Sequence, residues 1–159
     1  MSNLKYVGNN LFIEKLSVTN VAKKNKTPFY LYSENQIREN YLKFKNTFKK
    51  INPLICFAAK SNSNLTILKT LGKLGAGTDV VSGGELLKAL KAGIKANKIV
   101  FSGVGKTEEE IRLAITKKIL LINCESESEA ILINKIAKKL RKKVSIGFRL
   151  NPNIDAKTH

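Results

Sequence analysis

The stretch from residue 53 to residue 93, "PLICFAAKSNSNLTILKTLGKLGAGTDVVSGGELLKALKAG", contains two apolar runs that are each followed by a helical pattern. The runs "PLICFAA" and "GTDVVS" have the length and composition of buried strands. The segments "LTILKTLGKLG" and "GGELLKALKAG" have helical spacing and stop at glycine, which favours the end of a helix. The stretch therefore predicts two consecutive strand–helix units.

The same alternation continues beyond residue 93. Strand-like runs recur in "KIVFSG", "ILLINCES" and "VSIGFRLNP", and helical patterns lie between them in "KTEEEIRLAITKK", with Thr107 as its predicted cap, and in "ESEAILINKIAKKLRKK". Helical crossovers require the strands to be parallel. We expect five parallel strands, adjacent in sequence order, near residues 54–59, 78–81, 99–102, 119–123 and 144–149.

Two architectures fit this repeat, an open doubly wound sheet and a (β/α)₈ barrel. The sequence contains no GxGxxG or Walker loop, which counts against nucleotide-binding versions of the open sheet. A barrel needs eight strands and typically about 250 residues. If the barrel interpretation is right, five strands in 159 residues make the chain a partial barrel.

The composition is that of a globular domain, with 43% hydrophobic and 26% charged residues. No apolar run is long enough for a membrane span, and "MSNLKYVGNNLF" lacks a signal-peptide pattern. Cys56 and Cys124 lie far apart in apolar runs, which favours reduced thiols in a cytoplasmic protein. No Cys/His cluster has metal-ligand spacing, and His159 is the only histidine, so we expect no metal site.

The net charge of +17 raises the question of a nucleic-acid partner. Only four of the 29 basic residues are arginine, the usual reader of guanine edges. The lysines are spread along the chain, and those in the last turns of helices suit the helix dipole. We therefore expect solvated lysine-rich helix faces and no nucleic acid. A basic nucleic-acid-binding module remains an alternative, which salt-sensitive binding to DNA would support.

Lys60 directly follows the first predicted strand, at the edge where parallel α/β folds place their chemistry. A partly desolvated lysine can present a neutral amine that attacks an aldehyde. A lysine that only extends into solvent from a strand end is the simpler alternative. The residues alone favour this simpler alternative.

Several segments resemble, in order, the N-terminal part of the diaminopimelate decarboxylase family, pyridoxal-phosphate (PLP) enzymes with an alanine-racemase type of barrel. They are "NLFIEKLSVTNVAKKNKTPFYLYSENQIREN", "CFAAKSNSN" with the family's lysine motif, "GAGTDVVSGGELLKALKAG" and "FRLNPNIDAKTH". The third is the most specific. Ornithine-type, arginine and carboxynorspermidine decarboxylases share the lysine motif but are less similar elsewhere.

The resemblance implies an α/β fold with about five of the eight units of a (β/α)₈ TIM barrel. Residues 35–159 would form an incomplete PLP-binding barrel. Residues 1–34 would contribute to a β-rich second domain and lead into the barrel, so residues 8–21 should lie outside it. Because "DAKTH" breaks off where relatives continue, we expect an N-terminal fragment. A separately encoded C-terminal half that completes it is one alternative.

The resemblance also implies a function for the intact enzyme, the conversion of the amino acid meso-diaminopimelate to L-lysine and CO₂ by a homodimer. Lys60 matches the lysine that binds PLP covalently. Asp79 matches an acid near that lysine, and Glu85 an active-site acid. Arg149 matches a residue close to the PLP ring. Structural roles remain alternatives for these three: a partnered strand carboxylate, a helix-dipole contact and a barrel-interior ion pair, respectively.

Other groups of the family have no match in this sequence. They are a histidine stacked on the cofactor, the phosphate loop, the acid paired with the pyridine nitrogen and a cysteine supplied across the dimer. We therefore expect the isolated chain to be inactive. The alternatives are another decarboxylase of the same superfamily and a non-catalytic remnant.

Overall fold

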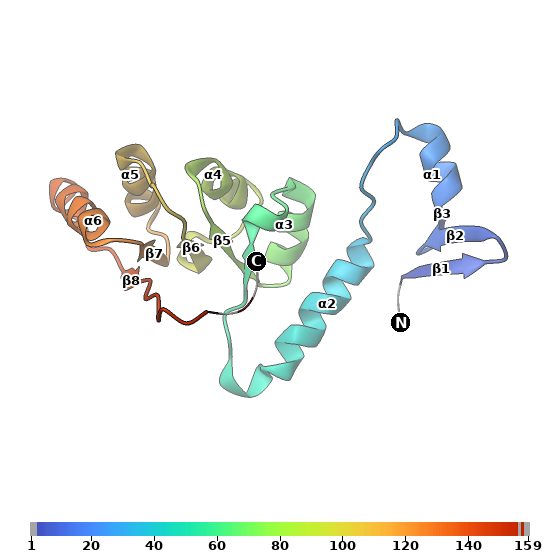
Figure 1. Cartoon of the computed structure of the whole chain (residues 1–159), viewed down its shortest axis with the longest axis horizontal. Coiled ribbons are helices and arrows are strands. Elements are labelled where there is room, and N and C mark those ends of the chain that lie inside the picture. Colours follow the sequence, from blue (N-terminus) through green and yellow to red (C-terminus); the bar gives the residue numbers. More distant parts are fainter. Residues whose placement is uncertain (1–2, 156, 158–159) are drawn as a thin grey trace. The chain divides into compact units, whose positions relative to one another are not determined.

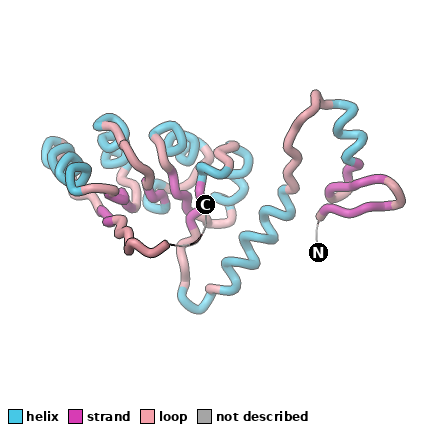
Figure 2. Tube along the Cα trace, viewed as in Figure 1, coloured by secondary structure: helices cyan, strands magenta, loops and turns pink. Residues whose placement is uncertain are grey.

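The computed structural model describes residues 3–155 and 157. The chain forms two compact units, residues 1–53 and residues 54–159. Figure 1 labels their helices and strands, and Figure 2 separates helices, strands and loops by colour. Within the described residues, no helix is long and apolar enough to cross a membrane.

The first unit contains a small antiparallel sheet in the order β1-β2-β3. Its elements are β1 (Leu4–Val7), β2 (Asn10–Ile13), β3 (Leu16–Ser17), α1 (Val18–Lys24), α2 (Glu34–Thr47) and the short 3₁₀ helix η1 (Lys49–Ile51). The serines before the two α-helices cap them, and Ser33 Oγ accepts a 3.0 Å hydrogen bond from the Gln36 N–H. Strands β2 and β3, which lie within residues 8–21, pair only within this unit and take no part in the parallel sheet.

The second unit contains a five-stranded parallel sheet in the order β4-β5-β6-β7-β8. The strands are β4 (Cys56–Ala58), β5 (Gly77–Val80), β6 (Ile99–Phe101), β7 (Leu121–Cys124) and β8 (Ile146–Phe148). The helices between them are η2 (Ala59–Ser61), α3 (Leu65–Lys73), α4 (Gly83–Lys91), η3 (Ala96–Lys98), α5 (Glu108–Lys117) and α6 (Glu127–Lys139). All five strands that the sequence predicts are present, parallel and in the predicted order.

Each α-helix of this unit begins at a polar cap residue whose side chain accepts a backbone N–H. These residues are Asn64, Ser82, Thr107 and Ser126. The predicted glycine stops are also present: α3 and α4 are followed by Gly75 and Gly93, whose φ angles of 95° and 86° suit glycine. The helix boundaries thus follow from local chemistry.

Helices α3 to α6 lie along one side of the five strands (Figure 1). Alternate strand residues point to that side, among them Val80, Phe101 and Ile122, and they form one buried cluster with helix residues such as Leu86 and Ile133. A doubly wound sheet would carry helices on both faces and would have its first strand in the middle. The arrangement is therefore that of barrel units, and it excludes the open-sheet alternative.

The opposite face of the sheet carries the intervening residues Asp79, Val100, Leu121 and Asn123, which are only partly buried. At Gly77, β5 lies close to the residue that precedes β6, because an added Cβ would lie 2.3 Å from the Lys98 carbonyl oxygen. The candidate site lies where the face that carries Asp79 and Asn123 reaches the carboxyl edge of the sheet.

Helix α2 carries a pair of aromatic rings at its C-terminal end. On its periodic apolar face Tyr41 is buried, whereas Phe44 and Phe48 are exposed and pack against each other with ring centroids 4.9 Å apart. The two exposed rings therefore cover part of each other's apolar surface.

Candidate functional site

The carboxyl ends of β4 to β8 meet at one edge of the parallel sheet. Lys60 follows β4 at this edge, within η2, and Arg149 directly follows β8. The Arg149 N–H donates to the Cys124 carbonyl oxygen at 3.0 Å, so the β7–β8 pairing continues to that residue. Lys60 and Arg149 therefore lie on the same rim of the sheet.

Lys60 has an exposed side chain that makes no hydrogen bond or ion pair with any described residue. The residue before it, Ala59, is fully buried and belongs to the core. The residue after it is also held, because Ser61 Oγ donates to the Ala58 carbonyl oxygen at 2.8 Å. The backbone of Lys60 is therefore anchored while its amine stays available to a ligand. The desolvation that we expected for this lysine is not supplied by the described residues.

Asp79 lies in β5, in register with Ala58 of β4 and Val100 of β6. Its Oδ1 atom is buried and has no hydrogen-bond partner within the described part of the chain. Burial, and then the charge of Asp79, raises the pKa of the Cys56 thiol. A buried carboxylate oxygen without a donor is costly, so this atom marks a position where a bound group could donate a hydrogen bond.

Glu85 lies in the first turn of α4, where it makes local backbone contacts. Its N–H donates to Ser82 Oγ at 3.2 Å, and its carboxylate accepts the Val81 N–H at 2.9 Å. These bonds are those of a residue that stabilises a helix start. They give Glu85 a structural role, and the active-site role that the resemblance implies stays a prediction.

Arg149 faces a carboxylate that the sequence did not single out. Its Nη1 atom lies 3.5 Å from Glu125 Oε2, and 69% of its side chain is exposed, against 13% for Glu125. The Glu125 Oε1 atom is buried and has no hydrogen-bond partner among the described residues. Glu125 directly follows β7, as Arg149 follows β8, and this strand-end position is the signal that could have revealed it.

Lys106 is a second group that the sequence did not single out. It is buried in the loop after β6 and pairs with Glu129 at 3.1 Å. Nearby, hydrogen bonds from the N–H groups of Gly83 and Thr107 lower the pKa of Glu110. Glu110 of α5 thus connects the first turn of its own helix to the first turn of α4.

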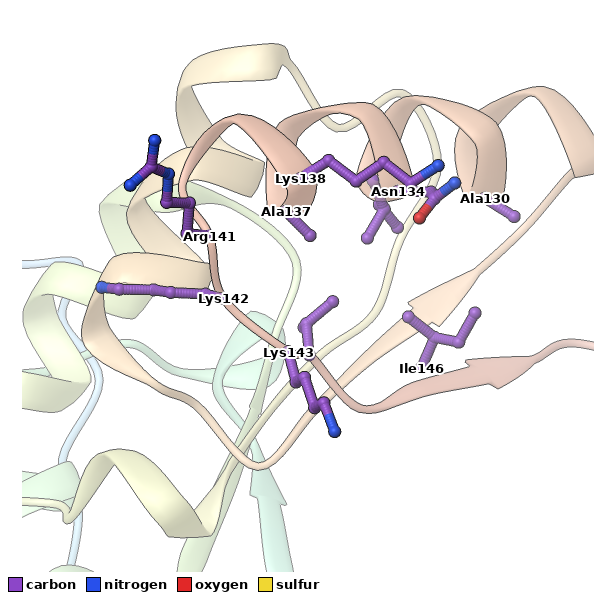
Figure 3. Close-up of a pocket in the computed structure, with 10 residues that line it drawn as sticks. Ala130, Asn134, Ala137, Lys138, Arg141, Lys142, Lys143 and Ile146 are labelled. Atoms are coloured by element: carbon purple, nitrogen blue, oxygen red, sulfur yellow. The ribbon is translucent and has the colours of Figure 1, made fainter.

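A hollow of about 490 Å³ lies elsewhere, between α6 and β8 (Figure 3). Ala137 of α6 and Ile146 of β8 face it, and the cationic residues on its rim are Lys138, Arg141, Lys142 and Lys143. None of Lys60, Asp79, Glu85 and Arg149 lines this hollow. Within residues 3–155 and 157, no three His, Cys, Asp or Glu side chains gather in a way that could hold a metal.

Comparison with known proteins shows similarity along nearly the whole chain. The family model described as pyridoxal-dependent decarboxylase, pyridoxal binding domain, matches residues 34–159. A diaminopimelate decarboxylase from Aquifex aeolicus is 47% identical over 156 residues, which are 98% of this chain and 37% of that protein. The chain therefore spans about a third of the length of the relatives that it matches.

Solved structures agree with the sequence similarity. The crystal structure of diaminopimelate decarboxylase from M. jannaschii superposes with a TM-score of 0.91 and 40% identity, over 99% of this chain and 38% of that one. The structure of the Helicobacter pylori enzyme complexed with L-lysine gives 0.85 and 50% identity, over 89% of this chain and 36% of that one. The sheet and helices described above match the N-terminal part of this decarboxylase barrel fold.

Proposed function

We propose that this chain, which belongs to the pyridoxal-dependent decarboxylases through its pyridoxal-binding domain, is the N-terminal part of a diaminopimelate decarboxylase. The intact enzyme would convert meso-diaminopimelate to L-lysine and CO₂. Support for this substrate comes from similar proteins of that name, which are 43–54% identical to the chain. Because the chain spans about a third of their length, the activity is proposed for the whole protein.

The observation that carries this proposal is the Lys60 amine at the carboxyl edge of the sheet, which has no partner among the described residues. The residues at this edge fit PLP: an exposed amine suits its aldehyde, and a buried carboxylate oxygen on Asp79 has no donor in the described part of the chain. When bound, PLP supplies a ring that accepts the electron pair left behind as CO₂ departs. Lys60 would hold the cofactor covalently.

Arg149 and Asp79 would place charge beside the cofactor. Arg149 would add positive charge from the position after β8, and Asp79 negative charge from β5. Between them lie Ser102, which follows β6, and Asn123 of β7. Asn123 Nδ2 donates to Ser102 Oγ at 2.9 Å, which satisfies these two polar groups without a ligand. Among the described residues of this group, the buried oxygen without a hydrogen-bond partner is therefore on Asp79, whereas Arg149 pairs with Glu125.

The domain division and the assembly are also proposals. Residues 1–34 would contribute to a β-rich second domain and residues 35–159 to the barrel. The antiparallel pairing of β1 to β3 supports the assignment of residues 1–34. A homodimer, or a separately encoded C-terminal half, would complete the protein. A cytoplasmic location is supported by the free thiols of Cys56 and Cys124, which stay reduced there.

The test begins with the purified chain, PLP and borohydride reduction, followed by peptide mass mapping. One pyridoxyl group should be found at Lys60, although the chain contains 25 lysines among its 29 basic residues. Lys60→Ala should remove the label, whereas Lys69→Ala, at another exposed lysine in α3, should not. Labelling spread over many lysines and unaffected by Lys60→Ala would refute the assignment.

The activity is tested with a chimera, because the chain alone should not exceed free PLP in releasing CO₂. Joined to the remaining part of the Aquifex aeolicus relative, it should release CO₂ and lysine from meso-diaminopimelate. The Lys60→Ala chimera should not. Release from ornithine or arginine, but not from diaminopimelate, would point to another decarboxylase of the superfamily.

A further inference from the structure

A buried ion pair fixes the turn between β7 and α6. Lys106 Nζ donates to both carboxylate oxygens of Glu129, at 3.1 and 3.2 Å, and to the carbonyl oxygens of Gly103 and Asn123, at 2.8 and 2.6 Å. The two side chains are 1% and 10% exposed. A buried lysine with all of its donors satisfied holds its neighbours in one arrangement, because any movement leaves a desolvated charge.

The groups that this ion pair holds are the backbone atoms on either side of Cys124. Lys106 binds the Asn123 carbonyl oxygen, and Glu129 Oε2 accepts the Glu125 N–H at 2.8 Å. The Cys124 carbonyl oxygen accepts the Arg149 N–H. The main chain is therefore fixed just where the Glu125 and Arg149 side chains leave it.

The Glu125 side chain is placed so that Arg149 is its only cationic partner among the described residues. One carboxylate oxygen lies 3.5 Å from the guanidinium, and the other is buried and has no hydrogen-bond partner within residues 3–155 and 157. Arg149, which is 69% exposed, has no other ion pair with a described residue. Glu125 is thus the fixed member of the pair, and Arg149 is the member that would move without it.

We propose that Glu125 is a positioning residue that holds the Arg149 guanidinium at the rim carrying Lys60, and that Lys106 and Glu129 hold Glu125 in turn. The inference rests on the proposed function, because the rim matters only if it binds PLP. It assigns no contact between Glu125 and the cofactor.

The first experiment measures the mobility of Arg149 directly. The chain has only four arginines, so their Nε–Hε resonances can be separated by NMR, and Arg149→Lys identifies the one required. Glu125→Gln should lower the heteronuclear NOE of Arg149 Nε. The matched control is Glu127→Gln, at an exposed glutamate two residues away, which should leave it unchanged. An unchanged Arg149 signal in Glu125→Gln overturns the inference.

A reverse experiment guards against misfolding of the Glu125 variant. Arg149 is largely exposed, so Arg149→Ala should fold. In this variant the side-chain carboxyl carbon resonance of Glu125 should shift, and that of Glu127 should not. The absence of any shift at Glu125 would equally contradict the pairing.

The second experiment is a double-mutant cycle on PLP affinity. Glu125→Gln should weaken binding roughly two- to fivefold, the range expected for loss of a partly exposed ion pair. In an Arg149→Ala background, Glu125→Gln should not weaken PLP binding further. If the two residues acted independently, their effects on affinity would add. If the proposed function is wrong, the result is different, because the unsubstituted chain then binds no PLP at Lys60. In that case the NMR experiments alone test the pairing of Glu125 with Arg149.

Discussion

Two lysines at the same edge of the sheet show how the same residue type takes opposite roles. Lys60 is exposed and has no partner among the described residues, whereas Lys106 is buried and donates to two carbonyls and a carboxylate. Substituting an exposed charged residue costs little, but substituting one member of a buried ion pair leaves the other charge uncompensated. Stability should therefore depend on Lys106 and ligand binding on Lys60.

Lys106→Met should lower the free energy of unfolding by about 3–5 kcal/mol, because Glu129 then stays buried without its cation. Lys60→Met, the matched change at the exposed lysine, should change it by less than about 0.5 kcal/mol. Urea titration of both variants measures the two values. Equal effects would show that the Lys106 pair is not buried as described.

A pH-dependent contribution comes from Glu110, whose pKa is lowered chiefly by hydrogen bonds from the Gly83 and Thr107 N–H groups. A pKa below the unfolded value means that the carboxylate stabilises the fold above that value, and that the effect is lost as the pH falls through the lowered pKa. Glu110→Gln should therefore lower the free energy of unfolding by up to about 1 kcal/mol at pH 7, and this loss should become smaller as the pH falls. Thermal unfolding against pH tests this, with exposed Glu109→Gln as the control.

At the level of elements, the sheet depends on one glycine where two strands meet. A Cβ on Gly77 would lie 2.3 Å from the Lys98 carbonyl oxygen and 2.8 Å from Cys56 Sγ, and a backbone oxygen cannot move without shifting the strand. Gly77→Ala should therefore destabilise the chain by about 1–3 kcal/mol or more.

The control for this change is Gly84→Ala, because the nearest atom to an added Cβ there is Ser82 Oγ at 3.8 Å. Alanine is the better helix former, so this variant should be as stable as the parent or up to about 1 kcal/mol more stable. Denaturant titration of both variants gives the comparison. A neutral Gly77→Ala would mean that β5 and β6 are farther apart than described.

The elements themselves could be predicted because their evidence is local. The apolar runs, the Thr107 cap and the glycines after α3 and α4 each lie within a few residues of the feature that they specify. The site could be predicted only in part. The rim position of Lys60 follows from strand order. The burial of Lys106 and the pairing of Glu125 depend instead on contacts between residues more than about 20 positions apart, in neighbouring strand–helix repeats. No local pattern encodes such contacts.

At the level of the whole molecule, the two units differ in how much they bury. Among residues 3–53 only Tyr41 is buried, and the strand residues Leu4, Tyr6 and Val7 are at least half exposed. Residues 54–155 hold the core cluster under α3 to α6. Since burial of apolar surface is the main stabilising term, the two sheets should differ in local stability although their strands are similarly short.

Hydrogen exchange measures this difference. In the isolated chain, amides of β1 and β2 should exchange at least about a hundredfold faster than those of β5 to β7, because an antiparallel sheet without a covered face opens easily. Similar protection in both sheets would contradict the low stability inferred for the first unit. Joining the remaining part of a related decarboxylase should then raise protection in β1 and β2 while leaving that of β5 unchanged. This outcome is expected because, in the proposed domain division, residues 1–34 pair with strands of the second domain, whereas the core beneath β5 is already complete in this chain.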